Sequence, residues 1–154
     1  MSVAIAQTRD IALCRALRRT VFIDEQGVSE ADELDDLDAV AIHLLARDEG
    51  QAIGSARLLV QAEVGKIGRV CVLAHARGRG IGAALIRHAV QRFGTVAGVT
   101  SVKLGAQTHA LGFYQALGFH AVGEVYDDAG IAHRDMVLDL SAPAQGRLTL
   151  KTTQ

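Results

Sequence analysis

A run of β-branched residues stops at a short arginine- and glycine-rich turn, and a helical pattern starts directly after it. The apolar run covers 70–73, the helix begins near residue 81, and the turn between them contains Arg77, Gly78, Arg79 and Gly80. A connection of this kind leaves backbone N–H groups unpaired at the positive end of the helix dipole. Such an end binds phosphate, the arginines add charge, and the glycines let a ligand approach the main chain closely.

The net charge of −1 hides two segments of opposite sign. No Asp or Glu occurs from residue 64 to residue 123, a block that holds Lys66, Arg69, Arg77, Arg79, Arg87, Arg92 and Lys103. No Lys or Arg occurs from residue 20 to residue 46, which holds Asp24, Glu25, Glu30, Asp32, Glu33, Asp35, Asp36 and Asp38. The cationic block suits a polyanionic ligand, whereas the acidic stretch is either a solvated surface or a region that attracts a cation.

Size and composition restrict the class of protein. At 154 residues and 49% apolar residues, the chain is expected to be one globular domain with a sizeable core. No apolar run reaches the ~18 residues of a membrane helix, and the N-terminus lacks a signal-peptide pattern, which predicts a cytoplasmic protein with no membrane contact. A pI near 6.6 and 4% aromatic residues argue against nucleic-acid binding.

The two cysteines, Cys14 and Cys71, form neither a disulfide framework nor a metal-ligand spacing, so no metal is expected. Cys14 lies in a helical pattern and Cys71 in a strand pattern, and we expect both to be small buried residues. The alternative is a catalytic thiol at Cys71, which needs a base beside it.

Apolar periodicity predicts seven strands and three helices. We expect strands over 3–6, 40–46, 52–60, 66–73, 101–106, 121–126 and 133–140. We expect amphipathic helices over 10–25, 81–93 and 110–117, the last two ending at Gly94 and Gly118. This order predicts an α+β fold (α/β mixed) with a mixed sheet and helices on both faces. We assign 1–140 to a single domain and 141–154 to a tail that is an extra strand, a dimer contact or disordered.

Two other anion-binding patterns fit less well. Gly78-x-Gly80-x-x-Ala83 satisfies the dinucleotide fingerprint, but the acidic residue expected ~20 positions later is absent. No Gly-Lys-Ser or Gly-Lys-Thr follows the glycines, which excludes a P-loop.

Two spaced motifs resemble those of the GNAT superfamily of N-acetyltransferases. Arg77-x-x-Gly80-x-Gly82, placed between a strand and a helix, resembles motif A of that family, which binds the pyrophosphate of acetyl-CoA. The segment from Gln107 to Phe119 resembles the family's Asn-x-x-Ala-x-x-Phe-Tyr-x-x-x-Gly-Phe, with Gln107 in place of Asn. Segments 21–26, 35–43, 105–108 and 128–133 resemble the ElaA-like branch of the family.

The resemblance implies a GNAT-like, mostly antiparallel sheet of six to seven strands and acetyl-CoA as the cofactor. It implies that the main chain of the strand carrying Val70 and Val72 pairs with the pantetheine arm, and that the Val72 N–H faces the thioester oxygen. The cofactor-binding residues implied are Val70, Cys71, Val72, Arg77, Gly78, Arg79, Gly80, Ile81, Gly82, Ala83 and Gln107.

The resemblance also implies that Tyr114 is the general acid that protonates the leaving thiolate. Many family members place a glutamate base on a central strand, and this chain has no carboxylate there. We expect the base to be His133 or Glu25, which lie in the ElaA-like segments, with His43 and Glu124 as further candidates. The acidic stretch 30–38 is expected to line the acceptor entrance and attract a cationic amine.

We therefore expect an acetyl-CoA-dependent N-acetyltransferase in which a primary amine attacks the thioester directly. The acceptor is a small molecule or a peptide, and a homodimer is plausible because strand edges are exposed. The alternative is a non-catalytic acyl-CoA-binding or sensory module that kept the loop and lost the base.

Overall fold

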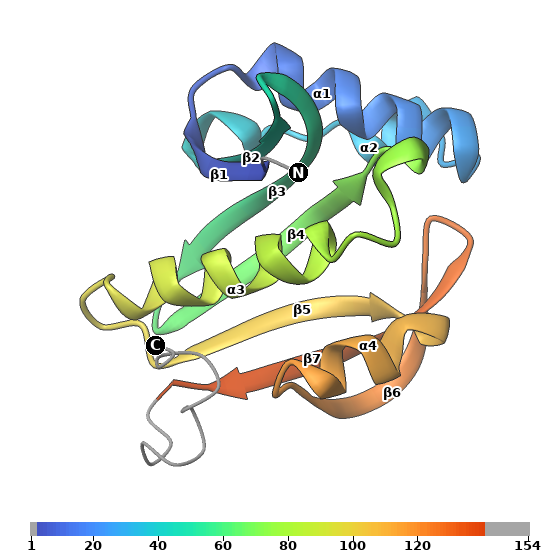
Figure 1. Ribbon diagram of the computed structural model, residues 1–154. Helices are drawn as coiled ribbons and strands as arrows, with labels where there is room; N and C mark the ends of the chain where they lie inside the picture. Colours follow the sequence, from blue (N-terminus) through green and yellow to red (C-terminus); the bar gives the residue numbers. More distant parts are fainter. Residues whose placement is uncertain (1–2, 141–154) are drawn as a thin grey trace. The chain divides into compact units, whose positions relative to one another are not determined.

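The computed structural model describes residues 3–140, and the predicted tail lies outside this range (Figure 1). The strands are β1 (Val3–Thr8), β2 (Ile42–Asp48), β3 (Gln51–Gln61), β4 (Val64–Val72), β5 (Ser101–Gln107), β6 (His120–Asp128) and β7 (Ile131–Asp139). The α-helices are α1 (Ile11–Arg18), α2 (Glu30–Glu33), α3 (Ile81–Gly94) and α4 (Leu111–Ala116). A π-helix, Arg19–Glu25, continues α1. No helix within residues 3–140 is long and apolar enough to span a membrane.

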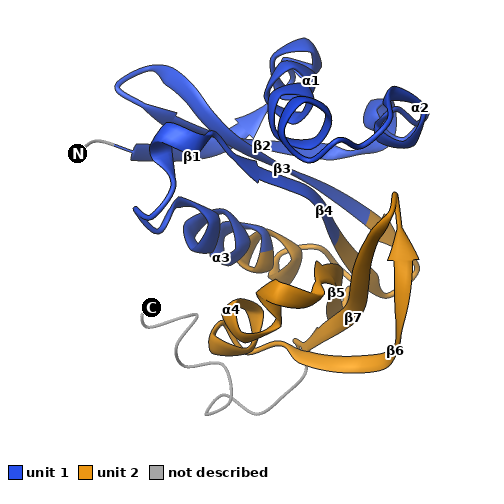
Figure 2. Ribbon diagram, turned by 90° about the vertical axis from the view of Figure 1, so that its right-hand side faces the viewer, with its two compact units in different colours: residues 1–59, 67–89 blue, residues 60–66, 90–154 orange. Residues whose placement is uncertain are grey.

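The strands form one seven-stranded mixed sheet in the order β1-β2-β3-β4-β5-β7-β6. The pairs β1–β2, β2–β3, β5–β7 and β6–β7 are antiparallel. The predicted α+β fold is therefore confirmed. The chain divides into two compact units: unit 1 comprises 1–59 and 67–89, and unit 2 comprises 60–66 and 90–154 (Figure 2). The assignment of 1–140 to a single domain stays a prediction.

Two hairpins, β2–β3 and β6–β7, have acidic, glycine-containing turns. The β2–β3 turn has Glu49 and Gly50 at φ +50° and +86°, and the β6–β7 turn has Ala129 and Gly130 at φ +54° and +82°. Two successive residues with positive φ suit the right-handed twist of an antiparallel pair. The turn chemistry therefore sets the pairing of these strands locally.

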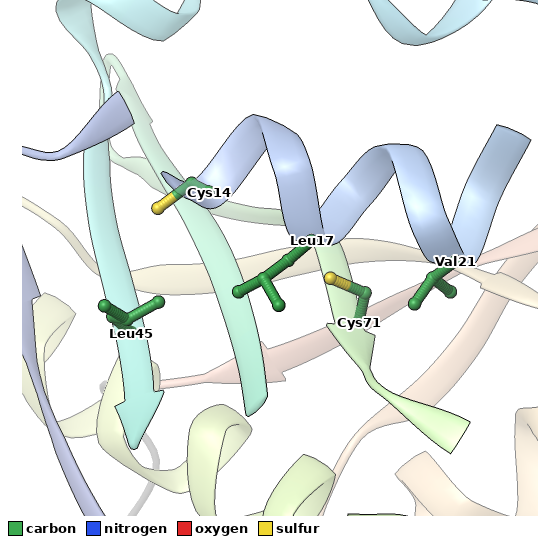
Figure 3. Packing of buried hydrophobic residues seen from close by; sticks show 5 residues of the cluster. All are labelled: Cys14, Leu17, Val21, Leu45 and Cys71. Atoms are coloured by element: carbon green, nitrogen blue, oxygen red, sulfur yellow. The ribbon is translucent and has the colours of Figure 1, made fainter. Parts of the chain in front are cut away.

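Helices cover both faces of the sheet in unit 1. On one face, Cys14, Leu17 and Val21 point from α1 and the π-helix toward Leu45 of β2 and Cys71 of β4 (Figure 3). All five side chains are buried, so both cysteines are buried as expected. On the other face, Leu85 of α3 lies next to Gly54 of β3 and is fully buried. The predicted face of α3 is confirmed, because Leu85, Ala89 and Phe93 have no exposed surface.

In unit 2, one face of β5 and β7 carries the apolar residues. Val102 and Leu104 of β5 are buried together with Met136 and Leu138 of β7. Gly118, at φ +102°, follows α4, and a Cβ on it would lie 3.3 Å from Leu138. Helix α4 therefore covers this apolar face, and the predicted glycine stop after the helix is confirmed.

A network of buried ion pairs holds the acidic stretch against the sheet of unit 1. The Arg18 guanidinium donates to both Asp38 oxygens at 2.9 Å and to Glu33 at 3.1 Å. Arg57 of β3 donates to both Asp35 oxygens at 2.8 and 2.9 Å and to Asp38 at 3.2 Å. Arg18, Glu33 and Asp38 are each at most 3% exposed. A charge removed from water is tolerated only when it is paired in this way.

Arg69 of β4 closes the network. Its side chain donates to Glu33 at 3.0 Å and to Asp35 at 3.2 Å, and its backbone has φ +51°. A left-handed arginine costs roughly 1 kcal/mol or more, and it persists where surrounding contacts hold it. The left-handed backbone at Arg69 is therefore explained by the contacts of its side chain with the acidic stretch.

These ion pairs correct the expectation for residues 30–38. Neither a solvated surface nor a region that attracts a cation describes Glu33 and Asp38, because both are buried and paired with arginines. The sequence placed cationic and acidic segments apart along the chain, and the fold brings them together. Of the side chains expected to draw in an amine, Glu30, Asp32 and Asp36 remain exposed, and Glu30 pairs with Arg19.

We expect Asp38→Asn to lower the free energy of unfolding by about 3 kcal/mol at pH 7, because it leaves buried arginines short of a countercharge. Burial by itself raises the pKa of Asp38, but hydrogen bonds from Arg18 and Arg15 hold that pKa well below its usual value. The stabilisation is therefore complete above the unfolded-state pKa and declines as the pH falls. Urea denaturation should show that the difference in free energy of unfolding between wild type and variant is about 1 kcal/mol smaller at pH 3 than at pH 7.

Arg15→Ala is the matched control, since Arg15 also contacts Asp38 but is 47% exposed. It should cost less than about 1 kcal/mol. Equal losses in the two variants would contradict a buried, paired Asp38.

Candidate functional site

The turn between β4 and α3 forms an exposed main-chain elbow in unit 1. Gly78 and Gly80 adopt φ +79° and +78°, a region that favours glycine. Apart from the adjoining residues of the chain, no atom lies within 4 Å of where a Cβ would stand on either glycine. The first turn of α3 contains no acidic side chain. The N–H groups that open α3 therefore face a region without a carboxylate from their own helix and with space beside the glycines.

Ion pairs hold the two arginines of this elbow. Arg77 donates from Nε to the Val72 carbonyl at 2.9 Å and from Nη2 to Glu25 at 2.8 Å. Arg79 donates to Asp48 at 2.7 Å. Each cation is thus held beside the start of α3 by an acid from another element. Glu25, a predicted base, is brought next to the elbow by the end of the π-helix and is paired there.

The end of β4 presents alternate side chains to opposite faces of the sheet. The Cys71 side chain lies in the cluster beneath α1, with Sγ 3.4 Å from Ser55 Oγ. Burial raises the pKa of the Cys71 thiol. A buried thiol with a raised pKa beside a hydroxyl is not an activated nucleophile, so the alternative of a catalytic Cys71 is wrong. Of Cys71, only the main chain is suited to touch a ligand.

The predicted acid Tyr114 lies on α4 in unit 2. Its ring makes edge-to-face contacts with Phe113 and Phe119, with centroids 5.0 and 6.2 Å apart. Burial raises the pKa of the Tyr114 phenol. The phenol therefore keeps its proton at neutral pH and is a donor rather than a base.

The predicted base His133 lies on β7, opposite Gln107 of β5 and Tyr126 of β6. Its Nδ1 is 2.7 Å from the Ile131 carbonyl oxygen. A carbonyl oxygen only accepts, so Nδ1 carries the proton in neutral His133 and Nε2 carries the lone pair. In the described part of the chain, Nε2 has no hydrogen-bond partner. His133 can therefore accept a proton at Nε2.

Tyr114 and His133 belong to opposite faces of the three strands of unit 2. His133 shares a face with Asp135, because the two residues are two apart on β7. Leu138, three residues beyond Asp135, points to the other face, which α4 covers. Gln107, at the end of β5, accepts a hydrogen bond from His109 at 2.7 Å. The structure thus places the predicted acid and the predicted base in one unit, on either side of the end of β5.

The further base candidates differ in their surroundings. His43 is buried, and its Nε2 lies 2.9 Å from the Asp38 carbonyl, so that nitrogen donates. Glu124 is exposed on β6. Sequence reasoning missed Tyr126 and Asp135. The Tyr126 ring stacks on His133, and the Tyr126 hydroxyl donates a hydrogen bond to Asp135 at 2.7 Å. Gly105 in the middle of β5 was the one available signal, because glycine within a strand marks a close approach.

Among the described residues, no three His, Cys, Asp or Glu side chains are grouped to hold a metal ion.

The tautomer of His133 can be tested directly. We expect long-range ¹H–¹⁵N correlation spectra at pH 8 to show the proton on Nδ1, because the Ile131 carbonyl accepts it. His75 is a suitable internal comparison, since it lies exposed in the turn before α3. A His133 ring protonated at Nε2 would contradict the geometry.

Three comparisons relate the chain to known proteins. A family model described as an acetyltransferase (GNAT) domain matches residues 22–140. The chain is 33% identical to the N-acetyltransferase YjcF of Bacillus subtilis over 124 residues, which is 80% of this chain and 88% of YjcF. It is 34% identical to ElaA of Escherichia coli over 128 residues, 80% of this chain and 84% of ElaA.

Solved structures of similar fold support the same family. The crystal structure of E. coli ElaA has a TM-score of 0.79 at 28% identity, with 89% of this chain and 99% of that chain covered. An acyl-CoA N-acyltransferase from Pseudomonas aeruginosa has a TM-score of 0.78 at 33% identity, with the same shares covered. The sequence motifs, the seven-stranded mixed sheet and these relatives lead to one conclusion: the chain belongs to the GNAT family of N-acetyltransferases and is an acyltransferase related to ElaA.

Proposed function

We propose that the protein transfers an acetyl group from acetyl-CoA to a primary amine of a small molecule or peptide, by direct attack of the amine on the thioester. The observation that carries this proposal is the elbow after β4. It combines two left-handed glycines, a helix start without acids and two held arginines. This set suits the pyrophosphate of coenzyme A.

In this proposal, the backbone N–H groups of Arg79, Gly80, Ile81, Gly82 and Ala83 bind the pyrophosphate. Gly78 shapes the turn, and the guanidinium groups of Arg77 and Arg79 add charge. Glu25 has the role of holding Arg77 rather than that of a base, because its carboxylate already pairs with that cation at 2.8 Å. The P. aeruginosa relative, named as an acyl-CoA N-acyltransferase, supports an acyl-CoA donor.

The main chain of Val70, Cys71 and Val72 is proposed to pair with the pantetheine arm, with Gln107 as a further contact. The Val72 N–H is the proposed donor to the thioester oxygen. A donor fixed before the reaction stabilises the developing oxyanion, and one such group contributes roughly 3 kcal/mol.

Two side chains carry the proton transfers of the reaction. His133 accepts one proton of the substrate ammonium at Nε2, since Nδ1 is committed to the Ile131 carbonyl, and the neutral amine then attacks the thioester. Tyr114 donates its phenolic proton to the departing thiolate of coenzyme A, and burial keeps that phenol protonated until then. The amine nitrogen adds to the carbonyl carbon to give a tetrahedral oxyanion, which collapses as the carbon–sulfur bond breaks, so no covalent enzyme intermediate is needed. The second proton of the nitrogen returns to the Tyr114 phenolate and restores the enzyme. The free thiols Cys14 and Cys71 fit a reducing compartment such as the cytoplasm.

The reaction is tested by thiol release from acetyl-CoA in the presence of polyamines, amino sugars and peptides. We expect amine-dependent release by the wild-type protein, and a kcat about 100-fold lower for Tyr114→Phe with an unchanged Kd for acetyl-CoA, because only the proton donor is lost. Release without acetylated amine would indicate hydrolysis. Binding of coenzyme A with no turnover of any amine would instead favour an acyl-CoA-binding module, and full activity of Tyr114→Phe would remove Tyr114 from the chemistry.

Cofactor binding is tested apart from chemistry by calorimetry with coenzyme A. Arg77→Ala should raise the Kd about 10-fold, since a charge-assisted contact to the pyrophosphate is lost. Arg92→Ala removes the same charge from the exposed last turn of α3 and should leave the Kd unchanged. Equal effects of both substitutions would point to a diffuse electrostatic attraction instead of a site at the elbow.

A further inference from the structure

The pairing of strands in unit 2 gathers polar side chains on the face opposite α4. In the β5–β7 register, Gly105 stands opposite Asp135 and Gln107 opposite His133. Because residues two apart share a face, Lys103 lies on this face as well. These residues are exposed or partly exposed, in contrast to the buried Val102, Leu104 and Ala106 that alternate with them. His133 therefore lies within a polar surface built from several strands.

An irregularity in β6 brings Tyr126 onto this surface. The register shifts between Val122, opposite Asp135, and Tyr126, opposite His133. The residues from Gly123 to Val125 thus stand against Arg134 alone. Gly123 has φ +74°, and its carbonyl accepts from Arg134 Nε at 2.8 Å. Bulges of this kind re-aim side chains, and here the bulge places an aromatic ring directly across from the imidazole.

Tyr126 contacts His133 through its ring and is anchored through its hydroxyl. The two rings are stacked, with centroids 5.9 Å apart and an angle of 23° between the planes. The hydroxyl donates to Asp135 Oδ1 at 2.7 Å, and Lys103 pairs with Asp135 Oδ2 at 3.3 Å. Burial raises the pKa of Tyr126, and Asp135 raises it further. The hydroxyl is therefore a permanent donor at neutral pH, which fixes the ring at both ends.

Gly105 leaves the space that this arrangement needs. A Cβ on Gly105 would meet the Tyr126 hydroxyl, with Asp135 Oδ1 3.8 Å away. The backbone at Gly105 does not have a positive φ, so a turn conformation is not the reason for glycine here. A glycine in the middle of a strand weakens the strand, and close approach of another group is the usual compensation. Here the group that approaches is the anchored end of Tyr126.

We infer that Tyr126 is the positioning residue of His133, and that Asp135 and Gly105 hold Tyr126 in place for this task. The inference rests on the proposed role of His133 as the base. The Ile131 carbonyl chooses the tautomer, and the stacked ring limits rotation of the imidazole, so that the Nε2 lone pair keeps one direction. The titratable groups on this face besides His133 are Lys103 of β5, His120, Tyr126 and Asp128 of β6, and Asp135 and Asp139 of β7, with His109 bonded to Gln107.

The test is a double-mutant cycle with His133→Asn and Tyr126→Leu, read as kcat for amine acetylation between pH 6 and pH 9. We expect each single variant to lower kcat, His133→Asn by about 100-fold and Tyr126→Leu by about 10-fold, with an unchanged Kd for acetyl-CoA. The double variant should match His133→Asn alone, because Tyr126 acts through His133. Tyr126→Phe, which keeps the ring but loses the hydrogen bond to Asp135, should give a kcat between those of the wild type and Tyr126→Leu. Val125→Ala, on the same strand and 59% exposed, is the control and should leave kcat unchanged.

Spectroscopy separates positioning from catalysis. In Tyr126→Leu and Gly105→Ala, we expect the His133 ring nitrogen signals to move toward values averaged over both tautomers, while circular dichroism shows an intact fold. Unaltered ring signals, or losses that add in the double variant, would overturn the positioning role and leave His133 as the base. Unchanged kcat in His133→Asn would instead remove the base from the proposed function, and the inference with it.

Discussion

The pairing of buried Arg18 with Asp38 and Glu33 is the interaction on which unit 1 depends. Arg18 closes the α-helical part of the first helical segment, and both carboxylates come from the acidic stretch. None of the three charges has access to enough water to be stable alone, so helix and loop must stay together. Arg57 and Arg69 extend the same pairing to β3 and β4. The helical segment held in this way ends at Glu25, which reaches Arg77 in the elbow.

In unit 2, the alternation of side chains along the strands determines on which face each group of the proposed reaction lies. Alternation sends Leu138 toward α4, which carries Tyr114, and sends His133 and Asp135 to the other face. An acyl transfer to an amine needs a proton donor near the leaving sulfur and a proton acceptor near the incoming nitrogen. In the proposed reaction, Tyr114 supplies the donor and His133 the acceptor. The proposal therefore needs no carboxylate between residues 64 and 123, where the sequence has none.

Local patterns predicted most of the secondary structure. The apolar stripe of Leu85, Ala89 and Phe93 is fully buried, and the two hairpin turns have the backbone that their glycines suggest. The π-helix was not predicted, because Leu17 and Val21 show the same spacing in an α-helix and a short π-helical stretch. The bulge before Tyr126 was missed as well, since a register shift depends on what the partner strand offers.

Sequence alone determined the family, the seven strands, the elbow with its glycines and arginines, and Tyr114 and His133 as candidates, because each of these rests on short-range spacing. Tertiary structure alone decided which charges neutralise one another and which ring nitrogen of His133 donates to the Ile131 carbonyl. It turned Glu33 and Asp38 from apparent surface charges into buried partners of arginines, and Glu25 into a partner of Arg77. The physical reason is that charge pairing, burial and hydrogen-bond direction depend on contacts between residues far apart in the chain.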